Sequence, residues 1–389
     1  MSSSPAFVGD RLRQVEDAGL LRRPPTVETR DGVRGRVNGR DCLLFCSNDY
    51  LSLRLDDSIR RAAIAAADQY GAGAGSSRLI AGSLPIHDAL EDAVAQWLET
   101  EAALVCSSGY QANLAMVQGL CGAEDLILSD ALNHASLIDG CRLSRARVQV
   151  LEHGEPGLSL GAHAEAGGQV FRLGEGLYSM DGDRGPVEDW VAAADAEKAG
   201  TSHVLIDEAH ALGIFGTQGR GVCAERGVAD RVLARVGTFG KALGAHGAFI
   251  ACSRDTRELL VNTGRTYIFT TGLPPAAAGA ALAAIGVVRS ERGMELRSRL
   301  RGVVSRLRCG LAELGLEVVG DEDAPIVPVL VGPAEEAMQL YASLLEQGIY
   351  AMAIRPPTVP EGTCRLRFTV SAAHTDADVD TALRVLSRL

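Results

Sequence analysis

The stretch Thr201–Gly244 has the sequence TSHVLIDEAHALGIFGTQGRGVCAERGVADRVLARVGTFGKALG. It begins with a short apolar run, 203–206, that predicts a buried parallel strand, and Asp207 stands where that strand should end. A second apolar run, 232–236, leads into a glycine-flanked loop that carries Lys241. Ligand groups gather at the carboxyl ends of strands in open α/β sheets. The stretch therefore indicates an α/β fold in which an acid and a lysine share a ligand site.

An aspartate and a lysine at neighbouring strand ends suit pyridoxal phosphate (PLP). The lysine condenses with the aldehyde of PLP, and the aspartate pairs with the pyridinium nitrogen. That charge pair keeps the ring protonated, so the ring can absorb electrons from a carbanion. The spacing alone equally fits a surface lysine in a Gly-rich loop and an acid that caps a helix, so the rest of the chain has to decide.

Composition limits the possible partners. The 389 residues carry a net charge of -11 and are 47% hydrophobic, which allows a substantial core and more than one domain. No apolar run predicts a membrane span, and the N-terminal residues lack the apolar core of a secretory signal. The nine cysteines form no CxxC pair, which favours reduced thiols. We expect a cytoplasmic protein with no metal site and with neither membrane nor nucleic acid as a partner.

Strand and helix patterns alternate through most of the chain. This alternation predicts a large, mostly parallel sheet with helices on both faces. Beyond about residue 294 the patterns favour a smaller α+β unit, with strands expected over 317–319 and 326–331. We expect an N-terminal helix and arm over 1–45, a large PLP-binding domain over 46–290 and a small C-terminal domain over 291–389. The strands expected in the large sheet are 102–106, 126–130, 169–173, 203–206, 232–236 and 247–253.

Three of these strands are followed by further candidate ligands. The segment Ser107–Asn113 opens a helix whose free N–H groups suit a phosphate, although an ordinary N-cap fits equally, and Tyr110 would lie near the ring. His134 follows strand 126–130, where a histidine can stack on a planar cofactor or be purely structural. Ser179, after strand 169–173, is placed to bind the 3'-oxygen of PLP.

Other segments gave plainer expectations. The Gly-rich segment 71–82 has no P-loop pattern, so we expect no nucleotide site there. Residues 151–170 are interpreted as a loose connection in which His153 and His163 are surface residues. Asp181 and Asp183 are interpreted as turn residues.

The strand predicted over 364–370 carries two arginines. One guanidinium there is suited to hold a substrate carboxylate through two parallel hydrogen bonds. Period-2 alternation puts Arg365 and Arg367 on the same face, so periodicity does not choose between them, and a structural ion pair is the alternative.

Together, these motifs resemble the α-oxoamine synthases. These are fold-type-I PLP enzymes that condense an amino acid with an acyl thioester and release CO2. The ordered set SNDYLSL, SSGYQAN, NHASL, SMDGD, DEAHALG, GTFGKALG and SAAHT spans residues 47–375. Within the family, AIRPPTVPEGTCRLR at 353–367 is most similar to the biotin-pathway branch. The resemblance implies a homodimer that condenses L-alanine with a pimeloyl thioester of coenzyme A or acyl carrier protein.

The resemblance also implies roles for single residues. Lys241 would bind PLP and act as the base, Asp207 would pair with the ring nitrogen, and His134 would stack on the ring. Ser179 and His210 would contact the 3'-oxygen region. The remaining implied contacts are to PLP, by Gly109, Tyr110, Thr238 and, across a dimer interface, Thr271, and to substrates, by Arg22, Asn48, Thr358 and Arg367.

The chain departs from the family pattern in three places, one of which is the unusually Gly-rich connection over 151–170. Ser52 replaces the usual glycine of NDYLGL, and Pro24-Pro25 interrupts the arm that carries Arg22. One alternative is an α-oxoamine synthase with another substrate pair, in secondary metabolism or resembling the 2-amino-3-ketobutyrate ligases. The other is a non-catalytic binding subunit of the same fold, which the presence of the lysine, the aspartate and the histidine argues against.

Overall fold

The computed structural model describes residues 5–157, 168–197 and 200–389. His163, and residues 158–167 of the expected loose connection, lie outside the described residues.

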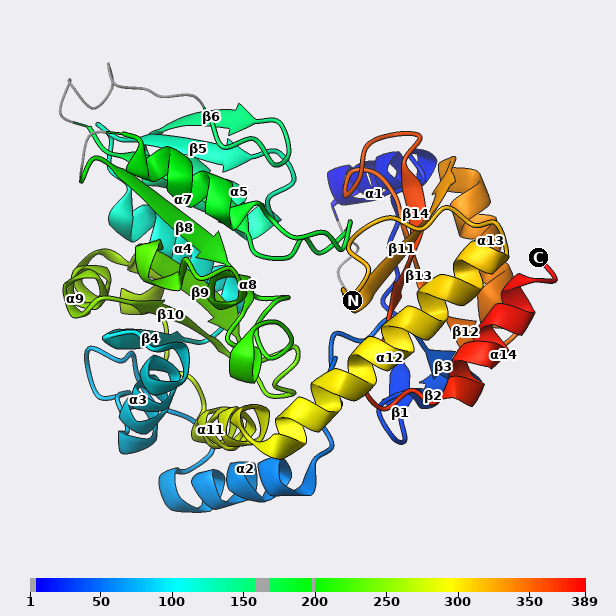
Figure 1. Ribbon diagram of the computed structural model, residues 1–389, viewed down its shortest axis with the longest axis horizontal. Helices are drawn as coiled ribbons and strands as arrows, with labels where there is room; N and C mark the ends of the chain where they lie inside the picture. Colours follow the sequence, from blue (N-terminus) through cyan, green and yellow to red (C-terminus); the bar gives the residue numbers. More distant parts are fainter. Residues whose placement is uncertain (1–4, 158–167, 198–199) are drawn as a thin grey trace.

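A seven-stranded sheet forms the centre of the larger half of the molecule (Figure 1). Its order is β4-β10-β9-β8-β7-β5-β6, and only β10 runs antiparallel to its neighbours. The prediction of a mostly parallel sheet is confirmed. The strands are β4 (Ala102–Cys106), β5 (Leu126–Asp130), β6 (Arg147–Leu151), β7 (Val170–Glu175), β8 (Ser202–Asp207), β9 (Ala234–Thr238) and β10 (Ala248–Cys252).

Both faces of this sheet are covered, which explains why its strands are almost uniformly apolar. Alternate residues of β4 enter different cores: Leu104 packs with one group of helices, whereas Val105 packs with the other. One set of helices comprises α4 (Gly109–Leu120), α5 (Ala135–Ser144), α9 (Arg254–Thr263) and α10 (Arg265–Ile268). The opposite set comprises α2 (Asp57–Tyr70), α3 (Pro85–Leu98), α7 (Val187–Asp195), α8 (Val222–Glu225) and α11 (Pro275–Arg289).

The smaller half contains two further sheets and is joined to the first by the long helix α12 (Glu291–Glu313) (Figure 1). One sheet has the order β11-β14-β13, the other β1-β2-β3-β12. The expected strand over 317–319 is only a single bridge, Val318 to Val329. The elements are β1 (Val27–Thr29), β2 (Arg34–Val37), β3 (Arg40–Leu44), β11 (Ile326–Gly332), α13 (Ala334–Glu346), β12 (Ile349–Tyr350), β13 (Met352–Ile354), β14 (Cys364–Thr369) and α14 (Asp376–Leu386).

The N-terminal segment joins the C-terminal half. β3 pairs in parallel with β12, so residues expected to form an extended arm complete a C-terminal sheet. Helix α1 (Ala6–Asp17) precedes them and buries none of its residues. The helix ends before Gly19, which has φ 66°. None of the helices within the described ranges has the length and apolar character of a membrane span.

Candidate active site

The candidate residues lie at or just beyond the carboxyl ends of the parallel strands β5, β7, β8 and β9. Register pairs Glu175 at the end of β7 with Asp207 at the end of β8, and Asp207 with Val236 on β9. The loop after β9 then carries Lys241. The structure therefore brings the predicted acid and lysine to the same sheet edge, together with a second carboxyl group that the sequence analysis missed.

Lys241 lies in a confined environment. Burial, against the opposing negative charges of Asp207 and Glu175 and with a smaller contribution from the positive charge of Arg367, lowers the pKa of its ammonium group to about 8. A lysine with this pKa is partly neutral near neutral pH, so it is able to accept a proton.

Asp207 is held by donors on both carboxylate oxygens. The amide Nδ2 of Asn113 donates to Oδ2 over 2.6 Å, and the backbone N–H of Ala209 donates to Oδ1 over 2.8 Å. Asn113 also donates to the hydroxyl of Ser136, 2.8 Å away. Asn113 belongs to the motif SSGYQAN, but the sequence gives no sign that its side chain contacts Asp207, which lies 94 residues further along the chain.

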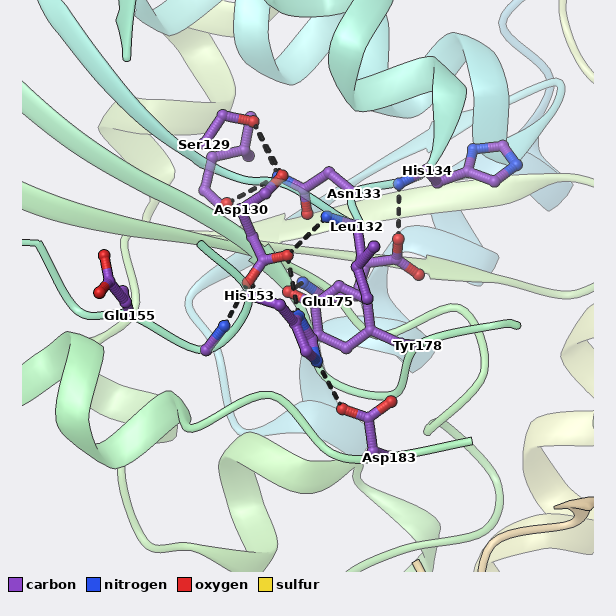
Figure 2. Close-up of polar contacts among 12 residues, drawn as sticks. Ser129, Asp130, Leu132, Asn133, His134, His153, Glu155, Glu175, Tyr178 and Asp183 are labelled. Carbon is purple, nitrogen blue, oxygen red and sulfur yellow. Dashed lines mark hydrogen bonds and ion pairs between the residues drawn. The ribbon is translucent and has the colours of Figure 1, made fainter. Parts of the chain in front are cut away.

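His134 caps helix α5 and is anchored to β7. Its backbone N–H donates to Oε1 of Glu175 over 2.6 Å (Figure 2). Its Nδ1 lies 2.7 Å from the hydroxyl of Ser136. Burial, and next the charge of Asp207, raise the pKa of Glu175 well above its usual range. Glu175 is thus a buried, protonated or proton-sharing group directly behind His134.

His210 is buried beside Tyr50. Its Nδ1 lies 2.7 Å from the Tyr50 hydroxyl, which in turn lies 3.2 Å from Oδ1 of Asn48. Burial, followed by the charges of Lys241 and Arg367, lowers the pKa of His210 well below its usual range. The imidazole is therefore neutral at physiological pH.

The start of α4 has the features on which the expected anion site depends. Ser108 caps the helix, and in the described part of the chain the N–H groups of Gly109 and Tyr110 have no hydrogen-bond acceptor. A Cβ on Gly109 would lie 3.9 Å from Cβ of Thr238, so the missing side chain leaves room between the helix and β9. The Tyr110 ring meets the His134 ring edge-on at 6.3 Å, and its hydroxyl donates to Asp139.

Ser179 and Thr271 contribute backbone contacts here. The carbonyl of Ser179 accepts from Nε of Arg367 over 2.6 Å, and the exposed Thr271 accepts from Ser107 through its carbonyl over 3.0 Å. Neither contact tests the side-chain roles expected for the two residues.

The two arginines of β14 differ in their partners. Arg365 forms an ion pair with Asp181, which is therefore more than a turn residue. Among the described residues Arg367 meets no carboxylate: its contacts are the carbonyl of Ser179 and, at 3.5 Å, Oδ1 of Asn48. The buried Arg367 thus retains the capacity to bind an added anion.

Arg22 and Thr358 lie together in a second place. They line a pocket of about 520 Å³ with aliphatic and aromatic side chains of the C-terminal half, and none of the residues around Lys241 belongs to its wall. Arg355 donates to the carbonyls of Gly19 and Leu21 and so holds the segment after α1 against this pocket. The lining residues are Leu21, Arg22, Arg23, Pro24, Pro25, Met338, Tyr341, Met352, Ala353, Ile354, Arg355 and Thr358.

His153 lies at the surface, as expected, but two partners that the sequence analysis did not foresee partly bury its side chain. Its ring lies between Asp130, at 3.0 Å from Nδ1, and Asp183, at 2.7 Å from Nε2 (Figure 2). Both aspartates lie far from His153 in the sequence, so no local sequence pattern predicts these contacts. Within the described ranges, no three His, Cys, Asp or Glu side chains are arranged to hold a metal ion.

Comparison with known proteins places this geometry in context. The profile of aminotransferase class I and II matches residues 40–386. The 8-amino-7-oxononanoate synthase of Geobacter sulfurreducens is 42% identical over 384 residues, which cover 98% of this chain and 97% of that protein.

Solved structures of related enzymes share the fold. A serine palmitoyltransferase from S. paucimobilis with a bound PLP–myriocin aldimine has a TM-score of 0.89 at 30% identity, with 98% of this chain and 96% of that chain covered. An 8-amino-7-oxononanoate synthase from Francisella tularensis has a TM-score of 0.76 at 27% identity, with 89% and 97% covered.

Proposed function

The chain belongs to the aminotransferase class I and II family and, within it, to the α-oxoamine synthases, and from that premise we propose that it makes 8-amino-7-oxononanoate for biotin biosynthesis. The reaction condenses L-alanine with a pimeloyl thioester and releases CO2 and the free thiol carrier. The observation that carries the proposal is the 42% identity to 8-amino-7-oxononanoate synthase over nearly the whole of both chains.

The residues present fit PLP. The start of α4 offers unpaired N–H groups and the positive end of the helix dipole to the phosphate, with Gly109 leaving space beside Thr238. Asp207 offers a fixed carboxylate to the pyridinium nitrogen, and Lys241 lies at the same sheet edge for the aldehyde. We assign Tyr110 to the rim of this site, because its ring stands next to that of His134.

When bound, PLP supplies an electron-withdrawing ring that stabilises negative charge at the α-carbon of the amino acid. Lys241 takes the α-proton, because burial has lowered the pKa of its amine to about 8. Asp207 holds the ring-nitrogen proton, and the Asn113 amide keeps its carboxylate from turning.

His134, His210 and Ser179 position the ring. His134 packs on one face, since its backbone is fixed to Glu175 and its Nδ1 to Ser136. His210, kept neutral by burial and by the charges of Lys241 and Arg367, meets the 3'-oxygen side together with Ser179.

Arg367 binds the carboxylate of the amino acid, with Asn48 beside it. The guanidinium is buried and has no carboxylate partner among the described residues, whereas Arg365 is already paired with Asp181. A planar guanidinium fixes the carboxylate through two parallel hydrogen bonds, and so aligns the bond to be broken with the ring.

The acyl chain occupies the pocket beside Thr358. Met338, Tyr341 and Met352 offer apolar contacts, and Arg22 adds a positive charge for an anionic group of the acyl donor. Both coenzyme A and acyl carrier protein remain candidate carriers of the thioester.

The assembly is a homodimer in which Thr271 reaches the phosphate of the partner's PLP. Thr271 is exposed, and the exposed apolar side chains of Phe269 and Ile80 lie on segments joined by the Ser77–Thr271 bridge. The cytoplasmic location and the division into units 1–45, 46–290 and 291–389 stay predictions.

Product analysis tests the proposal. Purified protein loaded with PLP is incubated with L-alanine and pimeloyl-CoA, and mass spectrometry should find 8-amino-7-oxononanoate and CO2. Parallel reactions with pimeloyl-loaded acyl carrier protein identify the carrier. Absence of the product with both donors contradicts the proposal.

A second substrate pair is the competing function. The higher TM-score of the serine palmitoyltransferase, 0.89 against 0.76, favours it, whereas the 42% identity favours alanine and a pimeloyl group. The same assay therefore also tests L-serine and glycine with long-chain and acetyl thioesters. If one of these pairs has a higher kcat/KM than L-alanine with a pimeloyl thioester, that pair becomes the proposed substrates.

A further inference from the structure

His153 bridges two loops that the proposed mechanism uses separately. It follows β6, which pairs in parallel with β5, and β5 pairs in parallel with β7 on its other side, so the three strands end on the same side of the sheet. Nδ1 lies 3.0 and 3.1 Å from the two carboxylate oxygens of Asp130, the last residue of β5, and Nε2 lies 2.7 Å from Oδ2 of Asp183 (Figure 2). A carboxylate accepts but does not donate, so both ring nitrogens donate and the ring is an imidazolium.

Asp130 extends this bridge to the turn that ends at His134. Its carboxylate also accepts from the N–H of Leu132 and of Gly154, each over 2.8 Å. Two residues beyond Leu132, the N–H of His134 donates to Glu175. Hydrogen bonds from Leu132 and His134 thus fix the backbone between β5 and α5.

Asp183 extends the bridge to the turn that holds Arg367. Its carbonyl accepts from the N–H of Tyr178 over 2.9 Å, which closes the turn containing Ser179. The Ser179 carbonyl accepts from Nε of Arg367. The His153 ring also stands edge-on to the buried Tyr178 ring at 4.5 Å, so packing and charge fix the same turn.

We propose that His153 is a positioning residue of the active site: clamped between Asp130 and Asp183, it fixes the loop that carries His134 relative to the turn that holds Arg367. The inference rests on the proposed function, because His134 and Arg367 there orient the PLP ring and the amino-acid carboxylate. His153 touches neither and acts through both. The charged bridge is stable because the two carboxylates compensate the imidazolium in a half-buried place.

The test replaces His153 by glutamine, which keeps a polar side chain but cannot carry a charge or bridge both carboxylates in the same way. The control is His203→Gln. His203 is also half-buried, makes one contact of 3.0 Å to Gln169, and lies near the start of β8, at the sheet edge opposite Asp207. Both variants are compared with the native protein by PLP dissociation constant, by the circular dichroism of the PLP absorption band, and by KM for L-alanine separately from kcat.

We expect His153→Gln to weaken PLP binding, to change the circular dichroism band, and to raise the L-alanine KM by between about threefold and thirtyfold. We expect His203→Gln to lower thermal stability at most. A His153→Gln protein with native PLP spectra and native KM would overturn the proposal, even if its melting temperature fell.

A double variant tests whether the bridge acts as one unit. If it does, Asp183→Asn added to His153→Gln should raise KM little beyond the effect of either change alone. Independent, multiplying effects would contradict the clamp. The PLP spectra need no acyl donor, so they still decide the inference if the wild-type protein fails to make the proposed product.

Discussion

At the scale of single residues, the chemistry depends on one lysine whose charge is suppressed by its surroundings. Burial lowers the pKa of Lys241 to about 8, although Asp207 and Glu175 draw it upward. We predict that Lys241→Ala folds but cannot turn over, because the base is gone. Borohydride reduction of the native protein with PLP should label the peptide containing Lys241, and a label on any other lysine would contradict the assignment.

The two arginines of β14 give a matched pair for the next prediction. We expect Arg367→Lys to raise the L-alanine KM at least about tenfold, about 1.4 kcal/mol, because an ammonium cannot form two parallel hydrogen bonds to a carboxylate. PLP binding should be unchanged. The control is Arg365→Lys, whose native partner is Asp181. If the control shows the loss of affinity and Arg367→Lys does not, the carboxylate site lies at Arg365.

Residue types and order predicted much of the candidate site, because PLP chemistry demands an acid, a lysine and an anion cradle at strand ends. Residues that support these groups were missed for a physical reason. Asn113, Glu175 and His153 make their contacts to loops distant in sequence, and no local period encodes such a contact. The choice between Arg365 and Arg367 likewise required Asp181, since both arginines share one face of β14.

At the scale of elements, the proposed phosphate site lies between α4 and β9. A side chain on Gly109 would enter the gap toward Thr238. We predict that Gly109→Val weakens PLP binding at least about tenfold. The control is Gly286→Val in α11, where an added Cβ meets nothing within 4 Å. Titration of the cofactor-free proteins with PLP measures the affinity of each variant. Equal affinities for the two variants would contradict a phosphate site at the start of α4.

The loops that end β5 and β7 give a prediction about pH. Hydrogen bonds to Asp130 and then Asp183 raise the pKa of His153 to about 10, against an ordinary value of about 6.5. The folded state therefore binds the proton more tightly than the unfolded chain. The stabilisation is complete below about pH 6.5 and is lost as pH rises through about 10. Tyr178, the other titratable group against the ring, has a pKa raised by burial and stays neutral in this range.

We therefore expect the difference in thermal midpoint between the native protein and His153→Gln to be largest near pH 6.5 and to shrink toward pH 10. A difference that stays constant across this range would show that the bridge does not depend on the charge of His153.

Strand predictions succeeded where the apolar run was buried on both faces. β4 and β5 lie within the limits expected from sequence, and β9 begins two residues later than expected. β6 was not predicted, because most of its side chains are exposed at the sheet edge and it lacks an apolar run. The segment 317–319 failed as a strand because it forms only one bridge to β11.

At the scale of the whole molecule, two distant parts of the chain build the smaller half. β3 pairs with β12, and Asn48, shortly after β3, reaches Arg367 on β14. The sequence showed a change of character near residue 294 but not this return of the N-terminal segment, which depends on pairing across most of the chain. Arg367 also contacts the Ser179 turn, so the proposed carboxylate site lies between the two halves.

The last prediction concerns two exposed apolar side chains on segments beside the start of α4. Ile80 is 81% exposed and Phe269 is 72% exposed, and the bridge from Ser77 to Thr271 joins their segments. We expect these apolar side chains to be covered by the same segments of a second chain. A carboxylate in place of Thr271 would then repel the phosphate in the partner's site and leave its own site intact.

Mixing two inactive variants tests this arrangement. In a mixed dimer of Lys241→Ala and Thr271→Glu, one site carries both changes, whereas the other has a native lysine from one chain and a native threonine from its partner. Half of randomly mixed dimers are of this kind and half of their sites are intact, so about a quarter of the native activity should return after mixing under conditions that exchange subunits. If Thr271 instead served its own chain, every site would retain one change and no activity would return. Light scattering on the native protein supplies the independent check, since an active monomer would exclude a shared site.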